Sequence, residues 1–399
     1  MKKFMLFYVA VAIVILINVG CSELKIKMFE KFKGGKGKIL TKTEEINFEI
    51  IASHIMTVAA NLDGNEIQIV LDTGGLTIID KKIADSLNFE IEKIPNEDVE
   101  FAQVKETSLG GVSVYDLNAV KMDFRETFIA ENFQSFGMIG SDFFRFFQTS
   151  FDYQNQKVFF SNPKRMKANS NTEHLFKMKI ILPYFPTVKV VLNNEFKIKG
   201  MIDTGLNYAF VLPVGWLKNL SEEERAKAIK AKGFFAKWPF TEEPNNHLYL
   251  MNEIKIGDIV LKNEPVIFAE LPPFIEKDVL LIGKYFLDKY ITTLDYKHKQ
   301  VLFTETEPNN ISLNYSFGMY VFNAGDKFKI KGIWENSPAD KAGILLSDKL
   351  ISVNDMKCDE ITNFELFELM NDRDHKTVEL VIEREGEDVS IELEKNNLF

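Results

Sequence analysis

"VLDTGG" (Val70–Gly75) and "MIDTGL" (Met201–Leu206) place the tripeptide Asp-Thr-Gly twice in one chain, each time behind an apolar run. A single Asp-Thr-Gly is an ordinary turn in which the Asp side chain caps a backbone amide. Two copies in matching surroundings indicate a common structural cause. The fold is therefore predicted from the sequence around them.

Four blocks of sequence recur in the same order in the two halves of the chain. They are residues 55–74 with 188–205, 108–120 with 255–267, 137–147 with 280–290, and 151–160 with 294–303. Asp203 follows Asp72 by 131 residues, whereas Gly283 follows Gly140 by 143. One insertion in the second half, Ser221–Gly233, accounts for the difference of 12 and is predicted to be helical. Four matched blocks indicate an internal duplication.

Each half has the sequence pattern of short alternating β-strands. Asp63-Gly64 and Asn193-Asn194 occupy the same place between two apolar runs, so both pairs are predicted hairpin turns. "SNPKRMKANSNTE" (Ser161–Glu173) is rich in turn-forming and polar residues and is predicted to link the two halves.

The repeated Asp-Thr-Gly, each followed by "MIG" (Met138–Gly140) or "LIG" (Leu281–Gly283), resembles the aspartic peptidases, and most closely the bacterial retropepsin-like branch. The resemblance covers about residues 46–306. It implies two β-barrel lobes with Asp72 and Asp203 as the catalytic pair, and it implies a peptide or protein substrate with no cofactor and no metal. Because both copies lie in one chain, catalysis does not require a dimer.

The chemistry of the family explains why two carboxyl groups are needed. An isolated Asp has a pKa of about 3.9 and is a poor acid or base at neutral pH. Two carboxyl groups held about 3 Å apart cannot both ionise, so they share one proton. The ionised member takes a proton from a bound water, and the protonated member hydrogen bonds to the scissile carbonyl.

The neighbours of the two Asp residues have roles that the resemblance implies. Gly74 and Gly205 allow backbone N–H groups to approach the carboxylates, and in the family the Thr hydroxyls, here of Thr73 and Thr204, bond across between the loops. The family's next residue is usually Ser or Ala, whereas this chain has Gly75 and Leu206, so the outer hydroxyl is missing.

A flap that closes over a cleft strengthens hydrogen bonds to the substrate by excluding water. The positions of the two candidate flaps are Glu100–Leu109 and Glu242–Met251. Tyr249 is interpreted either as a flap aromatic or, in better agreement with the burial of aromatic residues, as a strand residue that faces the core.

After the turn-rich "TEPNN" (Thr306–Asn310), the remaining chain resembles a PDZ domain of the bacterial kind over about residues 312–396. "SPADKAG" (Ser337–Gly343) and "DKLISVND" (Asp348–Asp355) carry most of this resemblance. It implies that a peptide C-terminus binds to backbone N–H groups of Phe317, Gly318 and Met319, beside a helix at Asn363–Asn371. The alternative is a module that packs on the lobes and binds nothing.

The N-terminus has the pattern of a secretory signal. Lys2 and Lys3 precede an apolar run, Phe4–Ile17, which is short for a membrane span of about 20 residues. Gly20-Cys21 resembles a lipobox, which implies acylation of Cys21 and a lipid anchor in a membrane of the bacterial envelope. An uncleaved membrane anchor remains the alternative, and both interpretations place the body of the chain outside the cytoplasm.

Composition excludes several other classes of protein. The net charge of −10 disfavours nucleic acid as a partner. The five His residues are scattered with no pair at metal-ligand spacing. If Cys21 is acylated, Cys358 has no partner for a disulfide within the chain.

The predicted fold class is mainly β, with a bilobal double β-barrel and a small α+β PDZ domain. The predicted segments are a lipoprotein signal peptide (1–20), a flexible tether containing the basic "KGGKGK" (21–45), lobe 1 (46–166), lobe 2 (167–308) and the PDZ domain (312–399). The predicted function is that of an aspartic endopeptidase. The alternatives are a catalytically silent peptide-binding scaffold at the envelope, and a processing peptidase that acts on one partner.

Overall fold

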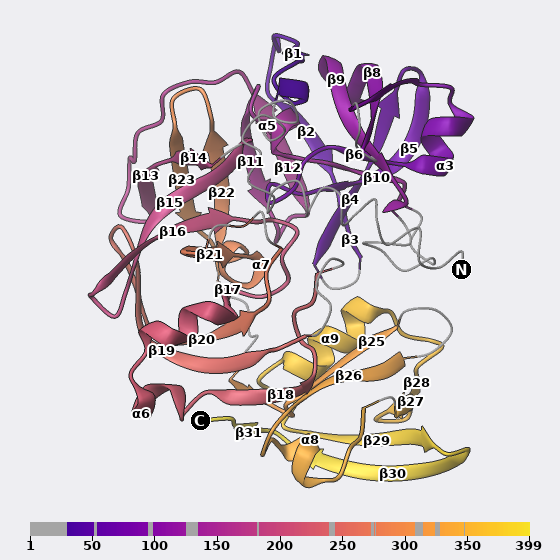
Figure 1. Ribbon diagram of the computed structural model, residues 1–399, viewed down its shortest axis with the longest axis vertical. Coiled ribbons are helices and arrows are strands. Elements are labelled where there is room, and N and C mark those ends of the chain that lie inside the picture. The colour runs from indigo at the N-terminus through magenta and orange to yellow at the C-terminus, as the bar shows by residue number, and fades with distance from the viewer. Residues whose placement is uncertain are drawn as a thin grey trace.

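The computed structural model describes most of the chain from residue 30 onward (Figure 1). The described residues are 30–51, 54–94, 99–124, 135–181, 183–238, 244–272, 275, 277–307, 314–323, 328–346 and 348–399. Strands account for 52% of the structure and helices for 11%, so the prediction of a mainly β chain is confirmed.

Each half of the chain forms a closed six-stranded β-barrel, and the two barrels have the same strand order. The first follows β4-β5-β10-β6-β9-β8, with bounds Ile55–Leu62, Asn65–Leu71, Gly137–Ile139, Ile78–Asp80, Val112–Met122 and Glu100–Leu109. The second follows β15-β16-β21-β17-β20-β19, with bounds Phe185–Leu192, Phe196–Ile202, Val279–Ile282, Phe210–Pro213, Ile259–Ala269 and His247–Ile256. The duplication seen in the sequence is therefore a duplication of the fold.

The first hairpin of each barrel turns where the sequence predicts. Asp63 and Gly64 have φ of 49° and 88°, and Asn193 and Asn194 have φ of 50° and 57°. Two consecutive positive φ angles match the twist of the flanking strands, and Gly, Asn and Asp adopt them at the lowest cost.

A six-stranded antiparallel sheet joins the two barrels, and each half contributes three of its strands. Its order is β13-β23-β22-β11-β12-β2, with bounds Glu173–Lys177, Gln300–Glu305, Tyr290–Asp295, Gln148–Asp152, Lys157–Ser161 and Glu44–Asn47. At its centre Ser150 pairs with Thr293, and their hydroxyls hydrogen bond at 2.8 Å. These two residues are 143 positions apart, which is the repeat offset. A pseudo-twofold axis therefore passes between them.

The segment from residue 30 to residue 40 is folded against lobe 1, so it is not the flexible tether that the sequence predicts. Phe32 is 2% exposed and Leu40 is 6% exposed. The Arg145 guanidinium donates hydrogen bonds to the carbonyls of Phe32 and Lys33, at 3.3 and 3.1 Å. β1 (Lys36–Gly37) pairs with β9. Burial of Phe32 and Leu40 among apolar residues of lobe 1 stabilises this basic, Gly-rich stretch.

The helix predicted for Ser221–Gly233 is wrong beyond its first turn. Ser221 caps it as predicted, in a capping box with Glu224, but α6 spans only Glu222–Arg225. The rest forms strand β18 (Ile229–Gly233), which pairs with β19 on one side and with β26 of the C-terminal module on the other. Strand pairing on both edges outweighs the helical propensity of this stretch.

In its described residues, the C-terminal module is a small β-structure with the helices α8 and α9 and its own apolar core. Its elements are β24 (Tyr315–Ser316), β25 (Met319–Asn323), β26 (Phe328–Trp334), α8 (Pro338–Lys341), β27 (Lys349–Val353), β28 (Met356–Lys357), α9 (Asn363–Asn371), β29 (Thr377–Arg384), β30 (Glu387–Glu394) and β31 (Asn396–Asn397). The predicted helix at Asn363–Asn371 is present with those bounds, and Asn354 and Asp355 form a turn with φ of 48° and 65°. Through β18 the sheet of lobe 2 continues into the module (Figure 1).

Short elements complete the lobes. They are β3 (Glu49–Ile51), β7 (Glu90–Lys93), β14 (Lys179–Ile181), α3 (Lys81–Ser86), α5 (Ser141–Phe144), α7 (Lys284–Leu287) and η2 (Val214–Asn219). In the part of the chain that the structure describes, no helix has both the length and the apolar character needed to cross a membrane. The predicted signal peptide and Cys21 lie outside the described residues.

Candidate active site

The two Asp-Thr-Gly loops begin at equivalent places, each at the end of a barrel strand. Asp72 follows β5, and its backbone N–H donates to the Ile139 carbonyl of the parallel strand β10 at 3.0 Å. Asp203 follows β16, and its N–H donates to the Ile282 carbonyl of β21 at 2.9 Å. The apolar-apolar-Gly strands therefore run directly beside the loops and fix where each Asp leaves its strand.

Hydrogen bonds between buried Thr residues lock the two loops together. The Thr73 N–H donates to Thr204 Oγ1 at 2.9 Å, and the Thr204 N–H donates to Thr73 Oγ1 at 3.2 Å. The Thr73 hydroxyl also donates to the Ile202 carbonyl at 2.8 Å. Both Thr side chains are 0% exposed, so each of these donors and acceptors would be unsatisfied without its partner.

The Asp72 and Asp203 carboxyl groups meet between the loops, each against the glycine of the opposite loop. Asp72 Oδ1 accepts from the Gly74 N–H at 2.7 Å and from the Gly205 N–H at 3.2 Å. The Gly205 N–H also donates to Asp203 Oδ1, at 3.1 Å. Backbone N–H groups of the two loops thus fix the positions of both carboxyl groups. Asp72 is partly exposed and Asp203 is 8% exposed.

The glycines of the two loops are required by the closeness of the opposite carboxyl group. A Cβ atom on Gly74 would lie 2.3 Å from Asp203 Cγ, and a Cβ atom on Gly205 would lie 2.6 Å from Asp72 Cγ. Real Cβ contacts are never this short, so any larger residue at either place would push the carboxyl groups apart.

The two carboxyl groups are electrostatically unequal. Burial raises the pKa of both. The pKa of Asp203 is raised well above its ordinary value, first by burial and then by the negative charge and hydrogen bond of Asp72. The same hydrogen bond lowers the pKa of Asp72, as do the Gly74 and Gly205 N–H groups. Two buried carboxyl groups this close therefore hold one proton between them, and the two backbone N–H donors on Asp72 Oδ1 favour the negative charge on that residue.

A buried Asp beneath the first loop has no counterpart in the second. Asp142, in α5, is 0% exposed, and its Oδ1 accepts from the N–H and the hydroxyl of Thr77 at 2.8 and 2.9 Å. The Thr77 hydroxyl in turn accepts from the Gly140 N–H at 3.3 Å. Burial raises the pKa of Asp142 to about 6. At the equivalent position, 143 residues later, lobe 2 has Tyr285.

Two equivalent Tyr residues that directly follow strands β11 and β22 also interact electrostatically with the pair, and they were not among the predicted site residues. Tyr153 and Tyr296 follow Asp152 and Asp295 in the repeated "DY" of the fourth block. Burial raises the pKa of both phenols well above 10, and the charge of Asp72 contributes to each shift. Among the described residues neither phenol has a hydrogen-bond partner. The repeat of this dipeptide was the sequence signal that could have identified them.

The two predicted flap regions are parts of long hairpins. Glu100–Leu109 is strand β8 itself, and the described part of Glu242–Met251 opens strand β19. Residues 239–243 lie outside the described residues. Tyr249 is 3% exposed and packs against Phe268 in the core, so its interpretation as a core residue is confirmed.

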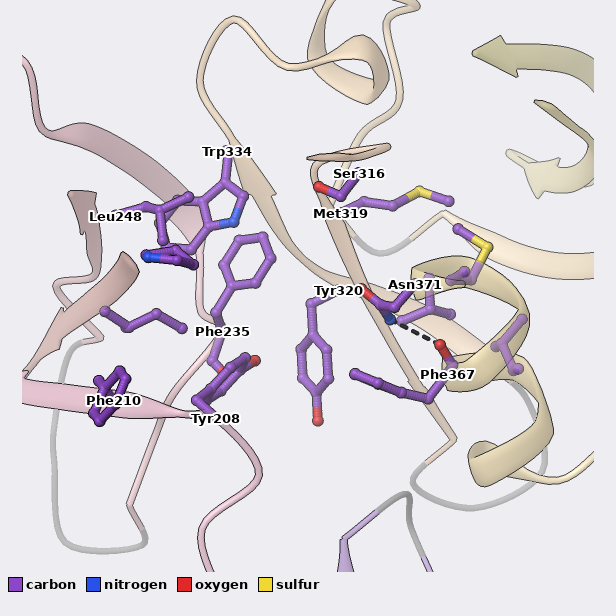
Figure 2. A pocket seen from close by; sticks show the side chains of 15 residues that line it. Tyr208, Phe210, Phe235, Leu248, Ser316, Met319, Tyr320, Trp334, Phe367 and Asn371 are labelled. Atoms are coloured by element: carbon purple, nitrogen blue, oxygen red, sulfur yellow. Dashed lines mark hydrogen bonds between the residues drawn. The ribbon is translucent and has the colours of Figure 1, made fainter. Parts of the chain in front are cut away.

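The three residues expected to bind a peptide C-terminus lie in the C-terminal module, away from the Asp pair. Gly318 has φ of 77°, and its N–H donates to Ser316 Oγ at 3.2 Å. Phe317 is 1% exposed in the core of the module, and Met319 begins β25. The groove between β25 and α9 is not free, because aromatic residues of lobe 2 lie against it (Figure 2).

Two comparisons of the chain with known proteins found no match. No protein-family model matches the chain, and none of the curated proteins matches it. Within the described ranges, no three His, Cys, Asp or Glu side chains gather in a way that could hold a metal ion.

Proposed function

We propose that the chain is an aspartic endopeptidase in which Asp72 and Asp203 activate a water molecule to hydrolyse a peptide bond. The observation that carries the proposal is that one backbone N–H, that of Gly205, donates to both carboxyl groups, which two duplicated loops bring together across a pseudo-twofold axis. A pair of carboxyl groups with one proton supplies a general base and a general acid at once.

The inequality of the pair suggests which residue has which role. Asp72 bears the charge in the resting state, so it is the group that takes a proton from water. Asp203 holds the shared proton and donates a hydrogen bond to the carbonyl oxygen of the scissile bond. The attack forms the C–O bond, and the proton gained by Asp72 then passes to the amine as the C–N bond breaks. The Thr73–Thr204 bonds and the glycine N–H groups hold both carboxyl groups still during these transfers.

The proposed location of the chain is the cell envelope, and its proposed partners are polypeptides. Acylation at Cys21 would anchor an exported chain in a membrane of the cell envelope. The C-terminal module would bind a peptide or protein C-terminus in the manner of a PDZ domain. Substrate, product and partner are all polypeptides in this proposal, and one chain is sufficient for catalysis because both loops belong to it.

The experiment that tests the proposed function compares D72N and D203N with wild type on a reduced, unfolded protein between pH 3 and pH 8. We expect each variant to lose about 10³-fold or more in rate, because Asn cannot take up or supply the shared proton. D278N, which changes an exposed Asp, is the control and should cleave like wild type. Wild-type rates in both variants would contradict the proposal.

A second pair of variants tests the geometry with the same assay. G74A places a methyl group against Asp203 Cγ, where the Cβ would lie at 2.3 Å, and should reduce the rate by about 10²-fold or more. G215A is the control, because a Cβ there meets nothing within 4 Å. New chain termini in envelope proteins show whether wild type cleaves any of them. If wild type cleaves neither these proteins nor the unfolded substrate, the peptidase proposal is wrong and the alternative of a peptide-binding scaffold holds.

A further inference from the structure

The Asp72 loop is held to its own lobe by hydrogen bonds from α5. Asp142 Oδ1 accepts from the N–H and the hydroxyl of Thr77, and the same hydroxyl accepts from the Gly140 N–H. Asp142 is 0% exposed and Thr77 is 4% exposed, so these bonds are made away from water. This Asp142–Thr77 clamp lies wholly within lobe 1.

Lobe 2 cannot form the same clamp, because aromatic residues replace both of its side chains. Tyr285 stands 143 residues after Asp142, at the repeat offset. Phe210 takes the place of Thr77, because the next residue in each lobe pairs with the first apolar residue of the apolar-apolar-Gly segment. The Phe210 side chain has no group that could hydrogen bond to a carboxyl group, so the Asp203 loop has no clamp of this kind.

The Asp203 loop is also longer than the Asp72 loop. From the Asp to the strand residue at the equivalent register, the sequence advances by 6 positions in lobe 1 (72 to 78) and by 8 in lobe 2 (203 to 211). The longer loop contains Tyr208, whose hydroxyl donates to the Phe235 carbonyl at 2.8 Å. Figure 2 shows Tyr208 and Phe235 facing Tyr320 of β25. The longer loop therefore lies against the C-terminal module.

Helix α9 of the module makes a second contact on the same side of lobe 2. Phe367 stacks on Tyr285 of α7, with ring centres 5.0 Å apart and 17° between the ring planes. Phe367 packs against the apolar core of the lobes, whereas its neighbour Leu366 is part of the module core. Tyr285 is 5% exposed, and Phe367 helps to keep it from water. The residue that replaces Asp142 is thus covered by the module.

Helix α7 is hydrogen bonded directly to the Asp203 loop. The Lys284 N–H donates to the Leu206 carbonyl at 2.8 Å, and the Gly283 N–H donates to the Ala209 carbonyl at 3.0 Å. A Cβ atom on Gly283 would lie 2.7 Å from the Leu206 carbonyl oxygen. The helix and the loop are therefore in close contact, and a shift of α7 requires a shift of the loop.

We propose that the C-terminal module is a positioning element of the candidate active site, in which Phe367 and Tyr320 support the Asp203 loop in place of the clamp that holds the Asp72 loop. Phe367 is a positioning residue that acts through Tyr285 and α7. The module then has a role that needs no bound peptide. The effect on catalysis rests on the proposed function, whereas the support of the loop does not.

Hydrogen exchange in the full chain tests the support of the loop without any substrate. F367A removes the ring that stacks on Tyr285, and exchange in residues 203–212 should become about tenfold or more faster. Residues 77–80 follow the clamp of lobe 1, and their exchange should stay unchanged. F399A removes a 41% exposed ring of the module and should exchange like wild type. Unchanged exchange in residues 203–212, or equal acceleration in both lobes, would overturn the proposal.

Two milder variants keep the test decisive if F367A unfolds. F367Y keeps the aromatic stack and should exchange like wild type. F367L keeps apolar volume but loses the stack, and exchange in residues 203–212 should become about threefold or more faster. Exchange in F367L that matches wild type would overturn the proposal.

Cleavage of the unfolded protein substrate tests the effect on the Asp pair. F367A should lower kcat by about tenfold and change KM by less than about twofold, because it displaces a reacting group. In the background of Y285A, F367A should change kcat by less than about twofold, because Phe367 acts through Tyr285. A wild-type kcat in F367A would overturn the positioning role. Faster exchange in F367A, in a chain that cleaves nothing, would overturn the proposed function and leave the support of the loop standing.

Discussion

At the scale of single residues, the chemistry of the site depends on which buried carboxyl groups stay protonated above their ordinary pKa. Asp72 and Asp203 do so as a pair because they face each other. Asp142 does so by itself, because its second carboxyl oxygen is buried and has no hydrogen-bond partner among the described residues. Arg145, Thr77 and Tyr296 are the polar groups that interact with Asp142 from the surrounding elements.

The pKa of Asp142 predicts how the stability of the chain depends on pH. Burial raises this pKa from 3.8 to about 6, so the folded chain binds an extra proton between these values. The free energy of unfolding therefore falls as the pH rises from about 4 to about 6, by about 3 kcal/mol from this one group. D142N keeps the oxygen that accepts from Thr77 but does not ionise, so this part of the loss should disappear.

The measurement is urea unfolding of wild type and D142N from pH 4 to pH 7.5. The Asp pair is present in both proteins, so the difference between the two pH profiles isolates Asp142. Parallel profiles would show that Asp142 ionises in the folded chain as easily as in the unfolded chain.

At the same scale, the sequence was sufficient for residues whose role is local or repeated. The positive φ angles of Asp63-Gly64 and Asn193-Asn194 follow from residue type, and the two Asp residues were marked by their repeat. Asp142 was missed because its partner, Thr77, lies 65 residues away and no copy of the pair exists in lobe 2.

At the scale of elements, the positions of the strands could be predicted from the sequence better than the identity of their pairing partners. The four repeated blocks correspond to strands or hairpins of both barrels and of the sheet between them. That β11 and β22 join the halves was not predicted, because a strand pattern does not specify its neighbour. The stretch that became β18 has a helical composition, and only its two partner strands, β19 and β26, explain its extended form.

The lock between the two loops makes a prediction at this scale. T73V and T204V each remove a hydroxyl that accepts from a buried N–H of the other loop. Each should reduce the free energy of unfolding by about 1–3 kcal/mol. The double variant should lose less than the sum, because either change already breaks the shared network.

Urea unfolding of the two single variants and the double variant measures this coupling. T172V is the control, since it removes an exposed hydroxyl that bonds only to Ser170 among the contacts described, and its effect should be small. Strictly additive losses would mean that the two loops are stabilised independently.

At the scale of the whole molecule, the module and lobe 2 form one continuous structure. β18 pairs with both, and Phe235 of lobe 2 stacks on Trp334 of the module with ring centres 3.8 Å apart. The sequence left open whether the module packs on the lobes, and the break at Thr306–Asn310 has the composition of a linker. Contacts made elsewhere along the chain join the two units regardless of that linker.

This continuity predicts a specific sensitivity at Gly233. It has φ of 70°, and a Cβ there would lie 2.2 Å from the Lys331 carbonyl oxygen of β26. G386A is the matched control, with φ of 88° and nothing within 4 Å of its Cβ. Both variants bear the strain of a left-handed residue, about 1–2 kcal/mol. G233A should lose about 1–3 kcal/mol more, because the strands must also separate.

Denaturant unfolding and hydrogen exchange in β18 and β26 check this prediction. Exchange in both strands should become faster in G233A and stay unchanged in G386A. Equal losses of stability in the two variants would show that β18 does not couple the module to lobe 2.

The central claim is that one proton is shared by Asp72 and Asp203, and a pH titration of ¹³C-labelled Asp carboxyl groups tests it most directly. Wild type should contain a carboxyl group that stays protonated well above the ordinary value of 3.8, and both D72N and D203N should remove or lower that titration. The separate titration of Asp142 is identified by its loss in D142N. If both members of the pair instead titrate independently at their ordinary value, the carboxyl groups do not share a proton and the account is wrong.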